Sequence, residues 1–527
     1  MTLQGFFVAG PFDDGDPVTG HYYEVASPDA ARPQVWGYTG ALSHLPGDVL
    51  RLHLSSTAPQ VHVEIARDGL VPQVVYAGDV AARFAPTPAD CSVTGCGWPE
   101  ALALTIPADW QSGVYTVTLT VPGHQSQHMF VLRAARPTAG IVMVLATGTW
   151  CAYNDWGGSN HYQGLTGPRG DDFAAHVSLL RPWARGFVGW PDDAPRIPHA
   201  SPLLSKPRYP HMDYARAKGI SKKYASSGWA AFERPFALWC EAQGIALDYT
   251  TQHDLHANPA ELDGYPRALI AGHDEYWTWQ MRDHLDGWLD RGGQLARFGG
   301  NFFWQTRLSD DLLTQTCFKS RADAEDPTPD PTRLTSYWDH PQVGRPAVAT
   351  MGLTGAMGVY AGWSRCAAHG TGGFLIWQPD HWAMQGTGLG YGDVLGAASK
   401  IFGYEVDGID LAMTHGLPHA ADGTGLQGPL TIVGMSPATT LSHSTGPHDR
   451  DSFIGTADAE EVALHVYGKV TPETVACASR GNGCMAEYRR GRGAVFNAAS
   501  CEWVAGLIAR ERPVEQVTRN ILLGDWG

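Results

Sequence analysis

The stretch YPRALIAGHDEYWTWQMRDHLDGWLDRGGQLARFGGN, residues 265–301, has the pattern of a strand, a helix and a second strand. The apolar runs 267–272 and 294–299 have the length of buried strands. Between them, four apolar residues recur on one helical face: Met281, Leu285, Trp288 and Leu289. Gly292 and Gly293 then provide a helix stop. We therefore expect two parallel strands joined by a crossover helix.

The same alternation extends to both sides of this stretch. Upstream lie a strand, IVMVLATGTW (141–150), an amphipathic helix, FERPFALWCEAQG (232–244), and a second strand, IALDYTT (245–251). Downstream we expect strands in VALHVYGKV (462–470), MAEYRRG (485–491) and GAVFNAAS (493–500), and a closing helix in PVEQVTRNILL (513–523). This rhythm predicts an α/β domain over residues 137–527, with a mostly parallel sheet covered on both faces.

The first quarter of the chain follows a different pattern. Short alternating segments occur in GDVLRLHLSS (47–56), QVHVEIARDG (60–69), SGVYTVTLTV (112–121) and HMFVLRAA (128–135), with turn residues between them. We expect an immunoglobulin-like β-sandwich over residues 1–136. The segment 136–138, Arg-Pro-Thr, is the expected linker. The predicted fold is therefore multidomain, with a sandwich followed by an α/β domain.

The charge balance excludes several classes of partner. The 527 residues include 53 Asp and Glu against 37 Lys and Arg, which gives a formal net charge of −16. This balance argues against binding to nucleic acid or to an anionic membrane surface. The most apolar run, AGIVMVLA (139–146), is far shorter than the roughly 18 residues of a membrane span, and the first residues lack the pattern of a secretory signal. We expect a cytoplasmic protein.

The cysteine pattern favours free thiols. There are nine cysteines, an odd number, and their spacings include no Cys-x-x-Cys pair. Buried thiols in a cytosolic protein are the simplest interpretation. A local disulfide between Cys91 and Cys96, or between Cys477 and Cys484, remains open. A zinc ribbon is excluded.

Candidate site residues follow the predicted strands. Ligands of open α/β sheets bind beyond the carboxyl ends of the strands, which points to the loops 151–158, 273–277 and 299–304. His273 and Glu275 are two apart at a strand end, so an extended backbone directs both to the same side. Such a pair suits metal binding, acid–base catalysis or a structural hydrogen bond.

Two further positions carry polar chemistry. Asn301 follows two glycines that allow close approach of a ligand, and its amide can hold a carbonyl or a water. Glu405 and Asp407 form another polar cluster with His381 and Asp393. Tyr153 is either a core aromatic or a functional group. The phosphate-loop, G-x-S-x-G and H-E-x-x-H motifs are absent from the sequence.

At these positions the chain resembles the large (beta) subunit of N,N-dimethylformamidase and its relatives. The phrases that carry the resemblance are AYNDWGG (152–158), LRPW (180–183), DLH…LDGYPRALIAGHDEYW (254–277), FGGNFFW (298–304), HWAMQGTGLGYGD (381–393), GYEVDG (403–408) and GRGAVFNAASCEW (491–503). The resemblance covers essentially the whole α/β part. It implies a glutamine-amidotransferase-like α/β domain behind an immunoglobulin-like one. It also implies a mononuclear iron, Fe³⁺, that serves the hydrolysis of N-substituted formamides, and either a homo-oligomer or an assembly with a small subunit.

The resemblance also implies roles for individual residues. Tyr153 and Glu275 match two metal ligands, and His273, Asn301, Glu405 and Lys319 match catalytic or supporting groups. The second tyrosine ligand of the family has no evident match. Where we place it, the chain has His176, and the alternatives are Tyr162, Tyr209 and Tyr214. A Tyr/His/Glu set carries one negative charge less than two phenolates and a carboxylate, and would suit Zn²⁺ or Mn²⁺ better.

The leading hypothesis is a metal-dependent amidohydrolase acting on a small neutral amide. The cation polarises a carbonyl or supplies hydroxide, Asn301 positions the amide oxygen, and Glu405 is a general base or a nucleophile. The second hypothesis is a non-catalytic protein that binds carbohydrate or a partner, since 19 tryptophans suit stacking on sugars. A third is an amidotransferase-like enzyme that uses Cys151 or Cys501.

Overall fold

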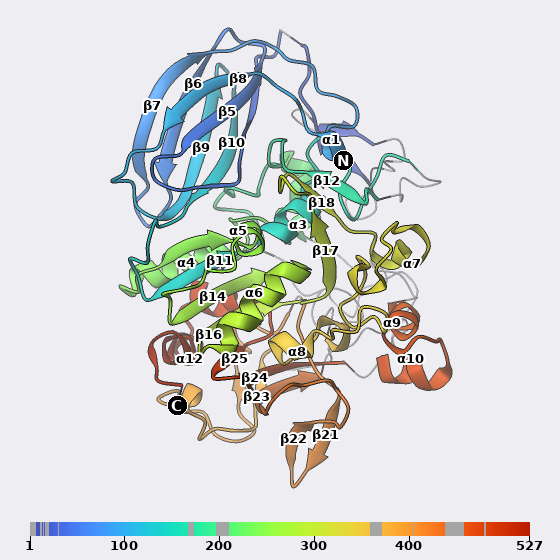
Figure 1. The fold of residues 1–527 in the computed structure, drawn as a ribbon. Helices are drawn as coiled ribbons and strands as arrows, with labels where there is room; N and C mark the ends of the chain where they lie inside the picture. The colour runs from blue at the N-terminus through green and yellow to red at the C-terminus, as the bar shows by residue number, and fades with distance from the viewer. Residues whose placement is uncertain are drawn as a thin grey trace. The chain divides into compact units, whose positions relative to one another are not determined.

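The computed structural model describes residues 7–10, 13, 15, 20–29, 31–166, 173–196, 210–358, 372–403, 405–437, 458–478 and 481–526. The chain divides into two compact units (Figure 1). Unit 1 contains residues 1–196, 210–254 and 308–316, and unit 2 contains residues 197–209, 255–307 and 317–527. The expected boundary at residues 136 and 137 lies inside unit 1, and its status as a domain boundary stays a prediction.

Two sheets enclose the first core of unit 1. One has the strand order β4 (Ser43–His44), β10 (His124–Leu132), β9 (Gly113–Val121), β6 (Gln60–Arg67) and β7 (Gln73–Ala81). The other has the order β3 (Val35–Thr39), β5 (Val49–Ser56) and β8 (Glu100–Thr105). Alternate residues of β5 and β6 face the shared core, which leucine and valine dominate. The expectation of a β-rich first part is confirmed.

The rest of unit 1 positions one of the candidate loops. The fully buried β11 (Ile141–Leu145) pairs in parallel with β13 (Asp248–Thr251). After β11 the chain enters α2 (Thr147–Tyr153), so Tyr153 is the last residue of this helix. Strand β12 (His176–Ser178) pairs with β18 (Thr314–Thr316), and this register sets His176 opposite Thr316. Unit 1 also contains β1 (Phe7–Ala9), β2 (Tyr22–Glu24), α1 (Cys91–Thr94), α3 (Pro210–Lys218) and α4 (Glu233–Ala242).

A strand–helix–strand element lies at the centre of unit 2, as predicted. Strands β14 (Arg267–His273) and β16 (Gln294–Gly300) pair in parallel, and α6 (Trp279–Asp290) connects them. The Thr278 hydroxyl accepts the Met281 N–H and caps the helix. β16 pairs in parallel with β25 (Gly493–Asn497), so three parallel strands form this part of the sheet.

The remaining strands of the sheet in unit 2 run antiparallel, so the sheet is mixed rather than mostly parallel. Their order after β25 is β24 (Asn482–Arg490), β23 (Leu430–Pro437), β19 (Phe374–Ile376) and β20 (Val394–Leu395). Only Gly491 and Arg492 separate β24 from β25. Because a two-residue turn can join only antiparallel strands, this short connection sets the direction of β24.

One predicted strand is wrong. The segment 462–470 was expected to be extended, but α9 (Asp458–Tyr467) covers most of it. Acidic residues at its start favour the helix amino terminus, and Gly468, with φ of 70°, follows its last residue. The closing helix is confirmed as α12 (Arg512–Leu523). Unit 2 further contains β15 (Tyr276–Thr278), β17 (Trp304–Leu308), α7 (Ala322–Glu325), α8 (Val348–Met351), β21 (Leu411–Thr414), β22 (Leu417–Ala420), α10 (Pro472–Ala478) and α11 (Trp503–Ile508).

Two expectations from composition concern the whole chain. The eight cysteines that the structure describes are free, including Cys91, Cys96, Cys477 and Cys484. Seven of the eight are buried, as expected. Within the described ranges, every helix is too short or too polar to cross a membrane.

The buried His128 predicts how unit 1 responds to acid. Burial lowers its pKa to about 3, so the folded state holds the neutral ring while the unfolded chain takes up a proton below pH 6.5. Stability should therefore fall between pH 6.5 and pH 3, by up to about 1.4 kcal/mol per pH unit from this group. Urea unfolding of His128→Gln between pH 6 and pH 4 should show a shallower slope than wild type. An unchanged slope would show that His128 does not contribute.

Candidate active site

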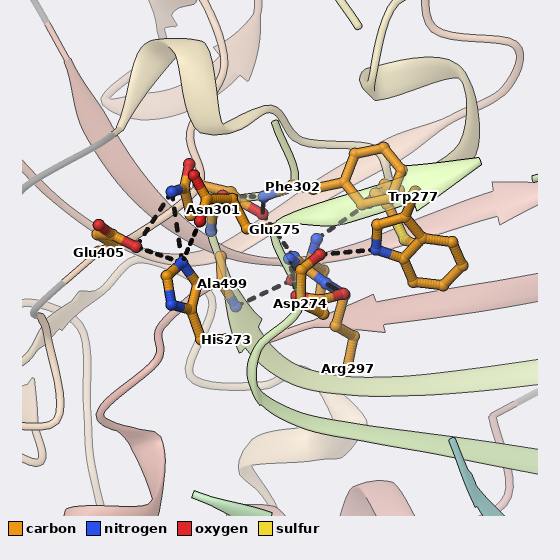
Figure 2. A network of polar contacts seen from close by, with 12 residues as sticks. His273, Asp274, Glu275, Trp277, Arg297, Asn301, Phe302, Glu405 and Ala499 are labelled. Carbon is orange, nitrogen blue, oxygen red and sulfur yellow. Dashed lines mark hydrogen bonds and ion pairs between the residues drawn. The ribbon is translucent and has the colours of Figure 1, made fainter. Parts of the chain in front are cut away.

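Four predicted residues meet in unit 2, and Figure 2 shows their side chains converging. The Nε2 atom of His273 lies 2.6 Å from Oε2 of Glu405 and 3.3 Å from Oε2 of Glu275. The Asn301 amide donates to the same Glu405 oxygen at 3.0 Å. All four side chains are buried. The structure thus brings together the loops after β14 and β16 and the segment around Glu405.

Glycines allow these loops to approach each other. In the β14–β16 register, Gly272 lies opposite Gly299 and His273 opposite Gly300. A Cβ on Gly300 would stand 2.4 Å from the backbone oxygen of Glu405, closer than atoms can pack. Asn301 then turns the chain with φ of 64°, a left-handed conformation that asparagine tolerates better than most residues. The GGN sequence is therefore a steric requirement of the site.

A buried guanidinium connects the three segments. Arg297, fully buried on β16, donates to Asp274 Oδ1 at 2.6 Å and to Asp407 Oδ2 at 2.5 Å. It also donates to Oδ1 of Asn497 on β25. Asp274 stands between His273 and Glu275, and Asp407 is two residues beyond Glu405. The ion pairs of Arg297 therefore fix the backbone on which three of the four candidate side chains are carried.

Asp407 also positions the fourth candidate. Its Oδ1 accepts the backbone N–H of Asn301 at 2.6 Å and that of Phe302 at 3.2 Å. These bonds hold the left-handed turn at Asn301, whose backbone conformation costs energy on its own. The Asn301 amide nitrogen is thereby directed to Glu405, while its Oδ1 is buried and has no hydrogen-bond partner among the described residues.

Burial and close charges shift the pKa values in this cluster. Burial alone would lower the pKa of His273, but the Glu405 and Glu275 carboxylates outweigh it and raise this pKa well above its usual value. Burial raises the pKa of Glu405, and the neighbouring His273 opposes that shift. Both shifts favour a protonated group, so the His273–Glu405 pair holds a proton at neutral pH.

Lys319 contacts the cluster through an aromatic ring. Its Nζ lies 4.9 Å from the ring centre of Trp304, and the Trp304 Nε1 donates to Oε1 of Glu275 at 2.7 Å. Lys319 is buried and has a left-handed backbone, with φ of 56°. A cation over the indole and a carboxylate on its N–H reinforce each other electrostatically.

Tyr153 belongs to unit 1, as do three of its candidate partners, Tyr162, His176 and Tyr214. The rings of Tyr153 and Tyr162 lie 4.5 Å apart between centres, and the Lys223 ammonium lies within 5.4 Å of both ring centres. His176 is exposed on β12, and its Nδ1 is 2.9 Å from the Thr316 hydroxyl. Of the other candidates, Tyr214 donates its hydroxyl to Asp193, and Tyr209 lies outside the described residues.

The loop between the two tyrosines is held by a second buried arginine. Arg181 donates to the backbone oxygens of Asn154, Trp156 and Ser159. In addition, the Asn160 side chain donates to the backbone oxygen of Tyr153 and accepts the backbone N–H of Tyr162. These bonds fold the segment 154–162 back on itself, which explains why two tyrosines nine residues apart lie side by side.

A third group of possible metal ligands shares two residues with the His273 cluster. One atom each from His273, Glu405 and Cys501 lie within 4.8 Å of one another, and all three residues are buried. Burial and the nearby Glu405 raise the pKa of the Cys501 thiol well above its usual value, so the sulfur is protonated at neutral pH. A neutral thiol is a weak nucleophile, which disfavours Cys501 as the nucleophile of the amidotransferase-like alternative.

Sequence reasoning missed the groups that support the site. Arg297 gave no signal because it lies inside an apolar strand. Asp407 was noticed only as part of a polar cluster. A charged residue in the middle of a buried strand needs a buried partner, and this rule would have paired Arg297 with Asp274 and Asp407.

Comparison with known proteins identifies the family. The family described as N,N-dimethylformamidase beta subunit-like, C-terminal, matches residues 63–516. The chain belongs to this family. The family takes its name from an amide hydrolase, so membership supports amide hydrolysis as the general class of activity.

Other comparisons add little. No match is found among curated proteins. A solved structure described as a chimeric titin Z1Z2-Z1Z2 tandem (Z1212), functionalised with a GRGDS exogenous peptide from fibronectin, matches at 23% identity and a TM-score of 0.13. The match covers 20% of this chain and 51% of that chain, about half of its length. At this TM-score the likeness supports no conclusion about fold or function.

The Arg297 ion pairs predict a large effect of one substitution. Arg297→Met should lower the free energy of unfolding by about 3–5 kcal/mol, because it removes the positive charge that pairs with two buried carboxylates. The control is Arg291→Met, which removes an exposed pair with Asp263 of the same 2.6 Å length and should cost less than about 1 kcal/mol. Urea unfolding measures both. Equal effects would contradict the supporting role of Arg297.

Proposed function

We propose that this protein is a metal-dependent hydrolase that cleaves the C–N bond of a small neutral amide, such as an N-substituted formamide. The observation that carries this proposal is the buried His273, held between the carboxylates of Glu405 and Glu275, with the Asn301 amide on Glu405. Membership of the dimethylformamidase family supports the same reaction class.

The finer fold assignment belongs to the same proposal. We infer that the paired sheets of unit 1 correspond to an immunoglobulin-like domain, and that the βαβ element of unit 2 belongs to a glutamine-amidotransferase-like domain. The two sheets around one core and the parallel β14–β16–β25 arrangement support these assignments.

Iron held by Tyr153, Glu275 and a second tyrosine stays a prediction of the family resemblance, with Tyr153 in unit 1 and Glu275 in unit 2. Tyr162 is favoured over His176, because its ring lies beside that of Tyr153 whereas the His176 side chain is exposed. Two phenolates and one carboxylate neutralise Fe³⁺, while the set with His176 would suit Zn²⁺ or Mn²⁺. When bound, such an ion polarises a carbonyl or lowers the pKa of a water.

In this proposal, side chains of unit 2 transfer the protons and bind the amide oxygen. Glu405 takes the proton of the attacking water, whose oxygen bonds to the amide carbon. His273 returns a proton to the leaving nitrogen when the C–N bond breaks, and Asn301 hydrogen-bonds the amide oxygen. Lys319 is a positioning residue, because its ammonium lies over the Trp304 ring, whose N–H donates to Glu275.

A competing position for the ion lies wholly in unit 2. The His273, Glu405 and Cys501 group offers nitrogen, oxygen and sulfur ligands at short range, a set that suits Zn²⁺. Such an ion would displace the hydrogen bond between His273 and Glu405 and convert both from acid–base groups into ligands. The two positions therefore predict different effects of substitutions.

Several broader assignments remain part of the proposal. The family is named for a beta subunit, which supports assembly with a small subunit, and a homo-oligomer is the alternative. Cytoplasmic localisation and the absence of nucleic-acid or membrane partners rest on composition.

Metal analysis of purified variants distinguishes the two positions. Tyr153→Phe, Tyr162→Phe and Glu275→Ala should each lower bound iron, with loss of the phenolate-to-iron absorption in the two tyrosine variants. Cys501→Ser and His176→Ala should keep the bound iron and the phenolate-to-iron absorption. Elemental analysis and visible spectra measure this. Retention of metal in the first three variants, with its loss in Cys501→Ser, would transfer the site to His273, Glu405 and Cys501.

The role of Glu405 predicts a kinetic effect that is separate from metal binding. Glu405→Gln should lower kcat by about 10²–10⁴, the contribution typical of a general base, while bound iron stays unchanged. The matched control is Glu487→Gln, since Glu487 also contacts a histidine, His381, at 2.8 Å in unit 2. Initial rates on a series of formamides measure both. A similar loss in both variants would argue against a specific role.

A further inference from the structure

The loop that follows β25, residues 498–502, lies at the carboxyl end of a parallel strand, the end at which α/β sheets form their sites. Ala499 in this loop is labelled in Figure 2 and has φ of 50°, a left-handed conformation that is strained for a residue with a side chain. The Asn497 side chain accepts the Ala499 N–H at 2.9 Å and also receives the Arg297 guanidinium. The buried Arg297 network therefore also fixes the bend of this loop.

The next residue, Ser500, is fully buried and directs its hydroxyl to the turn that precedes Glu405. Its Oγ lies 2.5 Å from the Ile401 backbone oxygen and 2.8 Å from that of Gly403, and it accepts the Gly403 N–H at 3.1 Å. The Glu502 N–H donates to the same Gly403 oxygen at 2.7 Å. One side chain and one backbone N–H thus hold this turn.

Backbone hydrogen bonds hold the chain at Glu405 and beyond it. The Cys501 N–H donates to the Glu405 backbone oxygen at 3.1 Å, and the Asp407 N–H donates to the Ala499 oxygen at 3.1 Å. The loop after β25 therefore binds the chain on both sides of Glu405. Of the bonds named here, only those of the Ser500 hydroxyl come from a side chain, so a substitution can remove them and leave the backbone bonds in place.

The turn at Gly403 depends on these bonds. Gly403 has φ of 147°, and the conformational freedom of glycine means that its own backbone preferences do not hold the turn. Two residues later, the Glu405 carboxylate lies 2.6 Å from Nε2 of His273 and accepts the Asn301 amide at 3.0 Å. A displacement of about 1 Å would break contacts of this length.

We propose that Ser500 is a positioning residue of the amide hydrolase. Its hydroxyl fixes the turn at Gly403, and this turn keeps the Glu405 carboxylate at hydrogen-bond distance from His273 and from the Asn301 amide. In this role Ser500 acts through Glu405 and does not itself contact the substrate. The inference rests on the proposed function, in which Glu405 is the general base, but the geometry that it concerns can be measured without a substrate.

Steady-state kinetics of Ser500→Ala on formamides test the proposal. The variant should lower kcat by about 10–100-fold, since a displacement of about 1 Å at a reacting group has an effect of this size. KM should change by less than about two-fold, with bound metal unchanged, because a misplaced general base weakens transition-state stabilisation rather than substrate binding. Ser500→Cys has a similar shape and bonds more weakly, so it should lower kcat as well, and it provides the same test if Ser500→Ala does not fold.

A crystal structure of Ser500→Ala separates failure of this inference from failure of the proposed function. In the variant, Oε2 of Glu405 and Nε2 of His273 should lie more than about 3.5 Å apart, beyond hydrogen-bond range. If the wild-type protein hydrolyses no formamide, the proposed function fails, and this distance still tests the role of Ser500. An unchanged distance would overturn the inference.

The matched control is Ser436→Ala in β23. Ser436 is also buried in unit 2, and its hydroxyl likewise donates to a glycine oxygen, that of Gly373 at 2.6 Å, and accepts a backbone N–H, that of Leu375 at 3.4 Å. Both substitutions remove a bonded buried hydroxyl and should lower the Tm by similar amounts, but only Ser500→Ala should lower kcat. An unchanged kcat in Ser500→Ala, or an equal loss of kcat in the two variants, would contradict the positioning role.

Discussion

The ion pairs of Arg297 are the constraint on which the candidate active site depends. A fully buried guanidinium costs several kcal/mol to remove from water, and only well-placed partners offset that cost. Here the partners are Asp274 and Asp407, which lie next to or near the residues that carry the chemistry. One cation thus joins β14, β16 and the segment that contains Glu405. Asp274, which pairs with Arg297, lies between His273 and Glu275 in the sequence, and Asp407 lies two residues after Glu405. Supporting and proposed catalytic residues therefore alternate along both segments.

Unit 1 uses the same device on a smaller scale. Arg181 is also buried, but it binds backbone oxygens rather than carboxylates, and it closes the loop between Tyr153 and Tyr162. Arg181 lies in LRPW (180–183), and Arg297 lies in the strand that precedes Gly299, Gly300 and Asn301. Neither arginine was singled out from the sequence. In each case the arginine holds the backbone, and neighbouring side chains are left for chemistry.

Local patterns predicted much of the fold and part of the site. Helical spacing from Met281 to Leu289 and the apolar strands around it were sufficient for β14, α6 and β16, because each signal is local. The antiparallel course of β24 was missed, since the decisive two-residue turn lies outside any strand pattern. His273, Glu275 and Asn301 were found from their place at strand ends. Cys501 could not be placed beside them, because its approach depends on Gly300 having no side chain.

Charge counting in the cluster favours a cation near Glu275. Four buried carboxylates, those of Asp274, Glu275, Glu405 and Asp407, face one guanidinium and one imidazole at hydrogen-bond range. With His273 protonated, the acidic groups of this set still exceed the basic ones, and the Lys319 ammonium lies 4.9 Å from the Trp304 ring centre. Buried negative charge without compensation is costly, so either a carboxyl keeps its proton or a metal ion supplies the missing charge. Glu275 receives the Trp304 N–H on one oxygen and lies 3.3 Å from His273 Nε2 through the other, and it is the carboxylate that our proposal assigns to the ion.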